Sequence, residues 1–96
     1  MTTNELLVKL HGLKDELKQQ FGIEEIALFG SYARGEANED SDVDIAILKM
    51  NLKDAFAIID AKEFLMNVLK KNVDIGTYKS MKTFIKNRIK KDFVYV

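Results

Sequence analysis

Three short apolar segments rich in β-branched residues constrain the fold of this chain more than any other feature. They are IEEIALF at 23–29, VDIAILK at 43–49 and VDIGT at 73–77. Branched and aromatic side chains favour strands, so we expect three strands here. About a dozen residues separate the first two strands, which is short for a crossover and favours antiparallel pairing. The sequence therefore predicts a β-sheet at the centre of the fold.

A first helix is expected before these strands. Thr3 or Asn4 can cap its start, and Gly22 can close its end. Its apolar residues recur at three- and four-residue steps, as in an amphipathic helix. They are Leu6, Leu7, Leu10, Leu13, Leu17 and Phe21.

The longest predicted helix begins near 51 and ends near 71, between the second and third strands. Asn51 followed by Asp54 resembles a capping box at its start. Its length suits a right-handed crossover that joins two parallel strands. The residues at helical spacing are Phe56, Ile58, Ile59, Leu65, Val68 and Leu69.

The last part of the chain is expected to form one more helix. Ser80 can cap it, and the tail 93–96, FVYV, can form a final strand or a docked end. Its predicted inward residues are Met81, Phe84, Ile85 and Ile89. The predicted fold class is α/β (α+β), a small mixed sheet of roughly three to four strands packed with about four helices. No proline, repeat or low-complexity run marks a linker, so we expect 1–96 to be one domain.

The composition excludes several kinds of site. Fifteen Lys and Arg balance fifteen Asp and Glu, so the net charge gives no sign of a nucleic-acid-binding protein. The chain has no cysteine and one histidine, His11, which excludes thiolate and histidine-rich zinc sites. Its N-terminus is charged and no apolar run reaches membrane-spanning length, so we expect a cytoplasmic protein without a membrane segment.

The charges are nevertheless unevenly distributed along the chain. The charged residues of 24–44 are acidic except for Arg34, and those of 70–91 are basic except for Asp74. The expected face of the last helix holds Lys79, Lys82, Lys86 and Lys90. A solvated face is the plainest interpretation, while docking of an acidic partner and steering of a triphosphate stay open. RNA ranks last, because no interleaved aromatic residues support base stacking.

Residues 30–44, GSYARGEANEDSDVD, are the most informative stretch. Gly30 follows a strand, and Ser31 is placed to cap a short helix. A helix N-terminus presents unpaired amides, glycine lets the backbone approach closely, and the serine hydroxyl adds a donor, so phosphate binds readily there. Arg34 can contact substrate or tie down the acidic loop. Its candidate partners in that loop are Glu36, Glu39 and Asp40.

Two aspartates open the second predicted strand. Asp42 and Asp44 are two residues apart, so their side chains project from the same face, about 6.5 Å apart along the backbone. Burying two carboxylates side by side is costly, and a divalent cation such as Mg²⁺ removes that cost. Asp74 is expected near the same edge as a third carboxylate. Ser41 is expected to bond locally or to orient the loop.

The stretch resembles the signature of the minimal nucleotidyltransferases, small members of the DNA polymerase beta-like superfamily. The matching positions are Gly30, Ser31, Arg34, Gly35, Ser41, Asp42 and Asp44. The order of the predicted helices and strands extends the resemblance over nearly the whole chain. Members of this family transfer a nucleoside monophosphate from a Mg²⁺-bound nucleoside triphosphate to an acceptor hydroxyl and release pyrophosphate.

The resemblance implies a role for each residue. Asp42 and Asp44 would hold two Mg²⁺ ions, and two metals can stabilise both the attacking and the leaving oxygens. Asp74 would help to bind one ion and draw the proton from the acceptor. The expected ATP-binding residues are Gly30, Ser31, Arg34 and Ser41.

The resemblance also implies a partner. Small proteins of this type are typically paired with a HEPN-domain toxin, which they are thought to silence by adenylylating a tyrosine, by masking, or by both. The length leaves room for one domain, so we expect the acceptor to come from a partner, a second subunit or solution. Two alternatives stay open: a non-catalytic antitoxin that works by contact, and a small-molecule nucleotidyltransferase completed by homodimerisation. Nothing in the sequence selects the base of the nucleotide.

Overall fold

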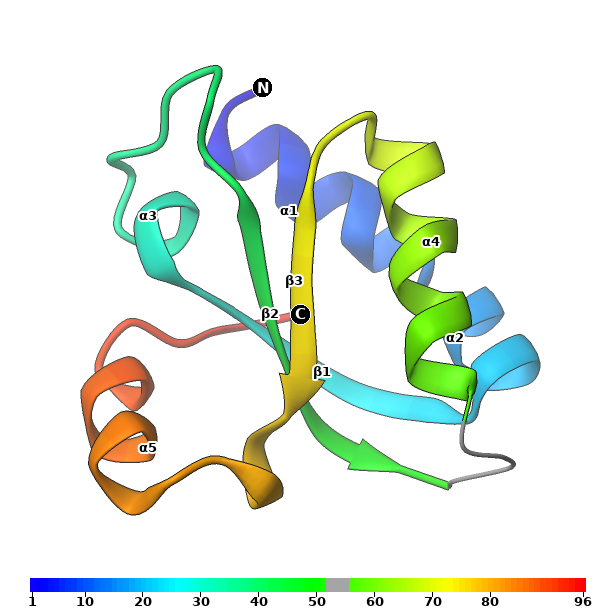
Figure 1. Ribbon diagram of the computed structural model, residues 1–96. Coiled ribbons are helices and arrows are strands. Elements are labelled where there is room, and N and C mark those ends of the chain that lie inside the picture. The colour runs from blue at the N-terminus through cyan, green and yellow to red at the C-terminus, as the bar shows by residue number, and fades with distance from the viewer. Residues whose placement is uncertain (52–55) are drawn as a thin grey trace.

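The computed structural model describes residues 1–51 and 56–96, and a mixed β-sheet lies at its centre (Figure 1). The strand order is β3-β2-β1-β4. β1 pairs antiparallel with β2 and with β4, whereas β2 and β3 are parallel, so both predicted pairings are confirmed. The strands are β1 (Ile23–Phe29), β2 (Val43–Met50), β3 (Val73–Thr77) and β4 (Val94–Tyr95).

Helices α1, α2 and α4 cover one face of this sheet, while α3 and α5 lie apart from that layer (Figure 1). The core between the sheet and the three covering helices is built from leucine on the helices and branched residues on the strands. A 3₁₀ turn, η1 (Tyr78–Ser80), follows β3. The helices are α1 (Thr3–Gly12), α2 (Lys14–Phe21), α3 (Gly30–Ala33), α4 (Ala57–Leu69) and α5 (Thr83–Lys90).

The first predicted helix is two helices, α1 and α2, which meet at Leu13. Gly12 ends α1, and a glycine weakens a helix because it has more backbone freedom to lose than any other residue. The cap is also one residue earlier than expected. Thr2 Oγ1 accepts from the Glu5 amide at 3.1 Å, and Glu5 Oε1 accepts from the Thr2 amide at 3.2 Å. Gly22 closes α2 at φ 72°, as predicted.

Helix α4 is shorter than predicted and turns a different side to the core. The expected capping box depends on Asp54, which lies outside the described residues. The buried stripe of the helix consists of Ala57, Ala61, Leu65 and Leu69. The two alanines at its start have small side chains, which let the helix approach the sheet closely. The prediction was therefore wrong for Phe56, Ile59 and Val68, which are 67%, 55% and 41% exposed. Lys70 ends the helix in the left-handed region at φ 57°.

The prediction for the last helix was wrong in its cap and, for Phe84 and Ile85, in its inward face, whereas Met81 and Ile89 are half-buried. Ser80 lies in η1, where its hydroxyl donates to the Thr77 carbonyl at 3.0 Å. Within α5 itself no residue is buried, and Phe84 is 69% exposed. A ring cluster formed by Phe29, Tyr78, Phe93 and Tyr95 supplies apolar contacts at the C-terminal side. The tail is a strand, because Val94 and Tyr95 pair with β1.

Candidate functional site

The end of β1 brings the backbone at Gly30 against a carboxylate of β2. Gly30 has φ +76°, a conformation that L side chains rarely adopt, and it opens the single turn of α3. A β-carbon at this position would lie 2.2 Å from Asp44 Oδ2. Glycine is therefore required twice here, by its backbone angle and by the space that Asp44 occupies. The 30–31 turn and the Asp44 carboxylate are direct neighbours.

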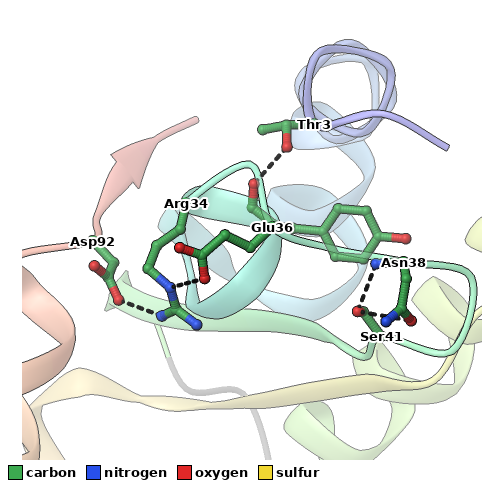
Figure 2. Close-up of polar contacts among 7 residues, drawn as sticks. Thr3, Arg34, Glu36, Asn38, Ser41 and Asp92 are labelled. Carbon is green, nitrogen blue, oxygen red and sulfur yellow. Dashed lines mark hydrogen bonds and ion pairs between the residues drawn. The ribbon is translucent and has the colours of Figure 1, made fainter.

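Ser31 does not cap α3 as the sequence predicts. The N-cap position is Phe29, which makes no side-chain cap bond, and Ser31 lies inside the helix. The reason is that Gly30 already turns the chain at its positive φ. Tyr32 is 1% exposed and belongs to the core, so it packs under the loop. Its carbonyl accepts a hydrogen bond from Thr3 Oγ1 at 2.5 Å, which ties α3 to α1 (Figure 2).

Arg34 joins α3 to the C-terminal segment. Its Nε lies 3.0 Å from Glu36 Oε2, and its Nη1 lies 2.8 Å from Asp92 Oδ2 (Figure 2). The hydrogen bond that the guanidinium donates to Glu36 raises the pKa of Arg34 most, and the one to Asp92 raises it further. Glu36 is one of the predicted loop partners of Arg34, so these contacts agree with the loop-clamping interpretation.

The C-terminal segment holds α3 at both ends. Asp92 pairs with Arg34, the C-cap of α3, while the ring of Phe93 lies 6.3 Å from that of Phe29, its N-cap. Neither the contact of Asp92 with Arg34 nor that of Thr3 with Tyr32 was predicted, because both join positions far apart in the chain. One signal was available: Asp92 is the only acid in 75–96, and it directly follows a basic region.

Ser41 has the local role that the sequence allows. Its Oγ accepts a hydrogen bond from the Asn38 amide at 2.9 Å (Figure 2). Asn38 Oδ1 accepts from the Asp40 amide at 2.8 Å. Lys71 Nζ donates to the Glu39 carbonyl at 2.7 Å. The acidic loop is thus held by hydrogen bonds within its own turn and by Lys71, which lies in the segment between α4 and β3.

The three predicted carboxylates lie at one end of the sheet. Asp44 on β2 is in register with Asp74 on the parallel strand β3, and Asp42 precedes Asp44 by two residues. Asp42 and Asp74 are exposed, and Asp44 is half-buried. Burial raises the pKa of the Asp44 carboxyl, and the negative charges of Asp74 and Asp42 raise it further. Arg34 acts in the opposite direction.

The raised pKa means that the ionised form of Asp44 is less stable at this site than it is in water. Within 1–51 and 56–96, no three His, Asp or Glu side chains gather closely enough to hold a metal ion by themselves. The register therefore brings Asp44 beside Asp74 without closing a cage of three protein ligands. Across these same two ranges, no helix is long and apolar enough to cross a membrane.

The chain is similar to known proteins over its whole length. It is 38% identical over 96 residues to the protein adenylyltransferase MntA of Thermococcus cleftensis, covering 100% of this chain and 97% of the relative. A solved candidate minimal nucleotidyltransferase has a TM-score of 0.80 at 24% identity and covers 98% of this chain and 95% of its own.

A complex of the tri-AMPylated HEPN toxin of Shewanella oneidensis with an MNT antitoxin also shares the fold. Its TM-score is 0.70 at 22% identity, and the match covers 98% of this chain and 71% of the other. Residues 10–96 match the family model of the nucleotidyltransferase domain. With this match and with a relative that is 38% identical over its full length, the chain belongs to the nucleotidyltransferase domain family.

Proposed function

We propose that this protein transfers AMP from ATP to a hydroxyl group, that of a tyrosine, on a HEPN-type toxin and thereby acts as an antitoxin. The observation that carries this proposal is the packing of Gly30 against Asp44. It sets the expected phosphate-binding turn beside the expected metal ligands. The Thermococcus relative is named as a protein adenylyltransferase, and the Shewanella complex holds an AMPylated HEPN toxin with an MNT antitoxin, which supports the choice of substrate and partner.

The donor set fits Mg²⁺. Asp42, Asp44 and Asp74 offer hard carboxylate oxygens, and Asp44 is half-buried beside two like charges that a cation would offset. Mg²⁺ usually retains waters and is held by one or two carboxylates together with substrate phosphates, so a closed protein cage is not needed. We propose Asp42 and Asp44 as the principal ligands of two ions, with Asp74 as a third. The ions supply charge stabilisation to both oxygens of the displacement when bound.

The remaining roles follow from position. We assign triphosphate binding to Gly30 and Ser31, because the turn that they form lies directly against Asp44, a proposed metal ligand, and the serine hydroxyl can donate to a phosphate oxygen. Asp74 takes the proton of the acceptor hydroxyl. Arg34 and Ser41 hold the loops around the nucleotide, Arg34 through Asp92 and Ser41 through Asn38. We further propose that 1–96 acts as a single domain in the cytoplasm.

The test uses ATP labelled at the α-phosphate, Mg²⁺ and the purified protein in extract from its own source. The critical variant is Asp44→Asn, and Asp60→Asn on the exposed side of α4 is the matched control. We expect label on a discrete protein band with the wild type and Asp60→Asn, and none with Asp44→Asn. Label on a small molecule alone would replace the protein acceptor with a small one. Neutralisation of the toxin without any label would leave an antitoxin that works by contact.

A further inference from the structure

Helix α5 presents an aromatic ring and two cations on its outer side. No residue of α5 is buried, and Phe84 is 69% exposed. Arg88 and Lys91 follow Phe84 by four and seven residues, so the three side chains lie along one side of the helix and its C-cap. All three residues are exposed. We call these three residues the Phe84 stripe.

The opposite side of α5 rests on the aromatic cluster at the C-terminal side. Lys86 is two residues from Phe84, which in a helix places it about 200° around the axis. Lys86 is half-buried, and its Nζ lies 5.5 Å from the centre of the Tyr78 ring. Tyr78 packs edge-on against Phe93. These contacts fix the rotation of α5 about its axis, and the Phe84 stripe therefore faces outward.

The surface around the stripe is positive and lacks a counter-charge. Residues 75–91 contain no acid, and Asp92, the next residue, is already paired with Arg34. In the described ranges 1–51 and 56–96, no cation of 79–91 forms an ion pair. Crowded like charges repel each other, and an acidic surface docked on them would remove that repulsion. The cations are Lys79, Lys82, Lys86, Arg88, Lys90 and Lys91.

An apolar recess lies beside the chain that leads into α5. It is a cavity of about 480 Å³, lined by Leu48 and Met50 at the end of β2 and by Thr77 and Ser80. Lys79 also lines it and joins it to the positive surface. A merely solvated lysine face has no use for such a recess, whereas an apolar side chain of a partner can fill it.

This combination fits an acidic protein better than a membrane or a nucleic acid. A helix that lies on a membrane needs a broad apolar face, but the stripe has a single apolar residue. Single-stranded nucleic acid is held by successive stacked rings, and Phe84 is the one aromatic residue of α5. By contrast, an exposed aromatic ring next to an arginine is typical of the residues that dominate protein–protein binding.

α5 and the proposed metal ligands lie on the same side of the sheet. Val43 and Ile45 belong to the core under the covering helices, so Asp44, between them on β2, points to the other side. α5 lies on that other side, to the left of the strands in Figure 1, with α4 to their right. The molecule is 34 Å long at most, so one folded domain is wide enough to contact α5 and reach Asp44.

We propose that the Phe84 stripe is the docking surface for the HEPN-type toxin. The stripe would meet an acidic surface of the toxin that holds an apolar pocket for the Phe84 ring, and the recess beside Lys79 would take a second apolar side chain. This inference rests on the proposed function, because that function supplies the partner.

The test measures docking in the absence of AMP transfer. The HEPN-type toxin from the same source, purified alone, is titrated by calorimetry into the wild type, Phe84→Ala and Arg88→Glu without ATP. Val8→Ala and Lys9→Glu make the same kinds of change at exposed positions of α1, on the covered side of the sheet. A thermal melt of each variant checks the fold, which should persist because no residue of α5 is buried.

We expect both stripe variants to weaken toxin binding roughly tenfold or more, and both controls to keep the wild-type Kd. Added NaCl should weaken binding by the wild type more than binding by Arg88→Glu. The toxin should also slow amide hydrogen exchange in α5 and leave α1 unchanged. Wild-type Kd values for both stripe variants, or unchanged exchange in α5, would overturn the inference. A single-stranded RNA oligonucleotide that binds the wild type and not Arg88→Glu, while toxin binding stays intact, would assign the stripe to RNA instead.

Failure of the docking assignment can be distinguished from failure of the proposed function. If the toxin binds through the stripe but carries no AMP after reaction with ATP and Mg²⁺, the docking assignment stands and AMP transfer to the toxin is refuted. If the toxin receives AMP while both stripe variants bind it with the wild-type Kd, the proposed function stands and the docking assignment is refuted.

Discussion

Replacement of Gly30 by alanine tests the contact on which the site is built. Alanine at φ +76° costs roughly 1–2 kcal/mol, because its β-carbon crowds the backbone in the left-handed region. The new β-carbon would also meet Asp44 Oδ2 at 2.2 Å, well inside van der Waals contact. The Asp44 side chain must rotate away, and leaving its preferred rotamer costs about 0.5–1.5 kcal/mol more. We expect Gly30→Ala to destabilise the fold by about 2–3 kcal/mol.

Gly35→Ala is the matched control for this substitution. Gly35 also has a positive φ, of +73°, but nothing lies within 4 Å of its would-be β-carbon. It should therefore lose only the backbone contribution of roughly 1–2 kcal/mol. In a domain of this size each kcal/mol lowers the Tm by roughly 4–8 °C, so melts followed by circular dichroism can resolve the difference.

The contact between Gly30 and Asp44 leads to two further predictions. Gly30→Ala should abolish AMP transfer, because the displaced carboxylate is a proposed Mg²⁺ ligand, whereas Gly35→Ala should retain the larger part of it. In an Asp44→Ala background, Gly30→Ala should cost only slightly more than Gly35→Ala, since the opposing carboxyl group is gone and only the β-carbon of residue 44, at 3.3 Å, still lies close. Equal losses of Tm for Gly30→Ala and Gly35→Ala in the native background would refute the reasoning.

Three more predictions concern charge and metal. The folded-state pKa of Asp44 is raised, so its ionised form opposes folding; Asp44→Asn should melt at a higher temperature than the metal-free wild type at pH 7. That gap should close as the pH falls through the raised pKa toward the ordinary value of 3.8, and a pH series of melts measures it. Asp92→Asn should lower the Tm only slightly but raise the KM for ATP, because Arg34 loses the charged partner that ties α3 to the C-terminal segment. Glu36→Gln should change the KM less, because Glu36 is the more exposed of the two partners of Arg34. Removal of Mg²⁺ by EDTA should abolish both label transfer and the rise in Tm caused by a non-hydrolysable ATP analogue, and readdition should restore both.

The sheet and the carboxylate register could be predicted from the sequence because their determinants are local. Strand positions followed from short branched segments, and pairing directions followed from the lengths of the two connections. Asp74 was assigned a place beside Asp44 because both open parallel strands, and the register between them agrees. Each of these inferences required only neighbouring residues and one rule of chain geometry.

The errors arose where packing between distant segments decides the outcome. Ala57 and Ala61 carry little hydrophobic signal, yet their small side chains let α4 approach the sheet and turn Ile59 outward. The apolar residues of α5 were assigned to the core, but Phe84 is exposed. Asp92 reaches Arg34 across 58 positions in the chain, a pairing that no local pattern encodes.

The central claim is that this chain attaches AMP to a protein through a metal site that includes Asp44. The most direct measurement is mass spectrometry of the acceptor after reaction with ATP and Mg²⁺, for the wild type beside Asp44→Asn checked for folding by its melt. The account predicts a tyrosine carrying AMP in the wild-type reaction and an unmodified tyrosine with Asp44→Asn. Equal modification by the two proteins, or no nucleotide on any protein with each of the four nucleoside triphosphates, would contradict it.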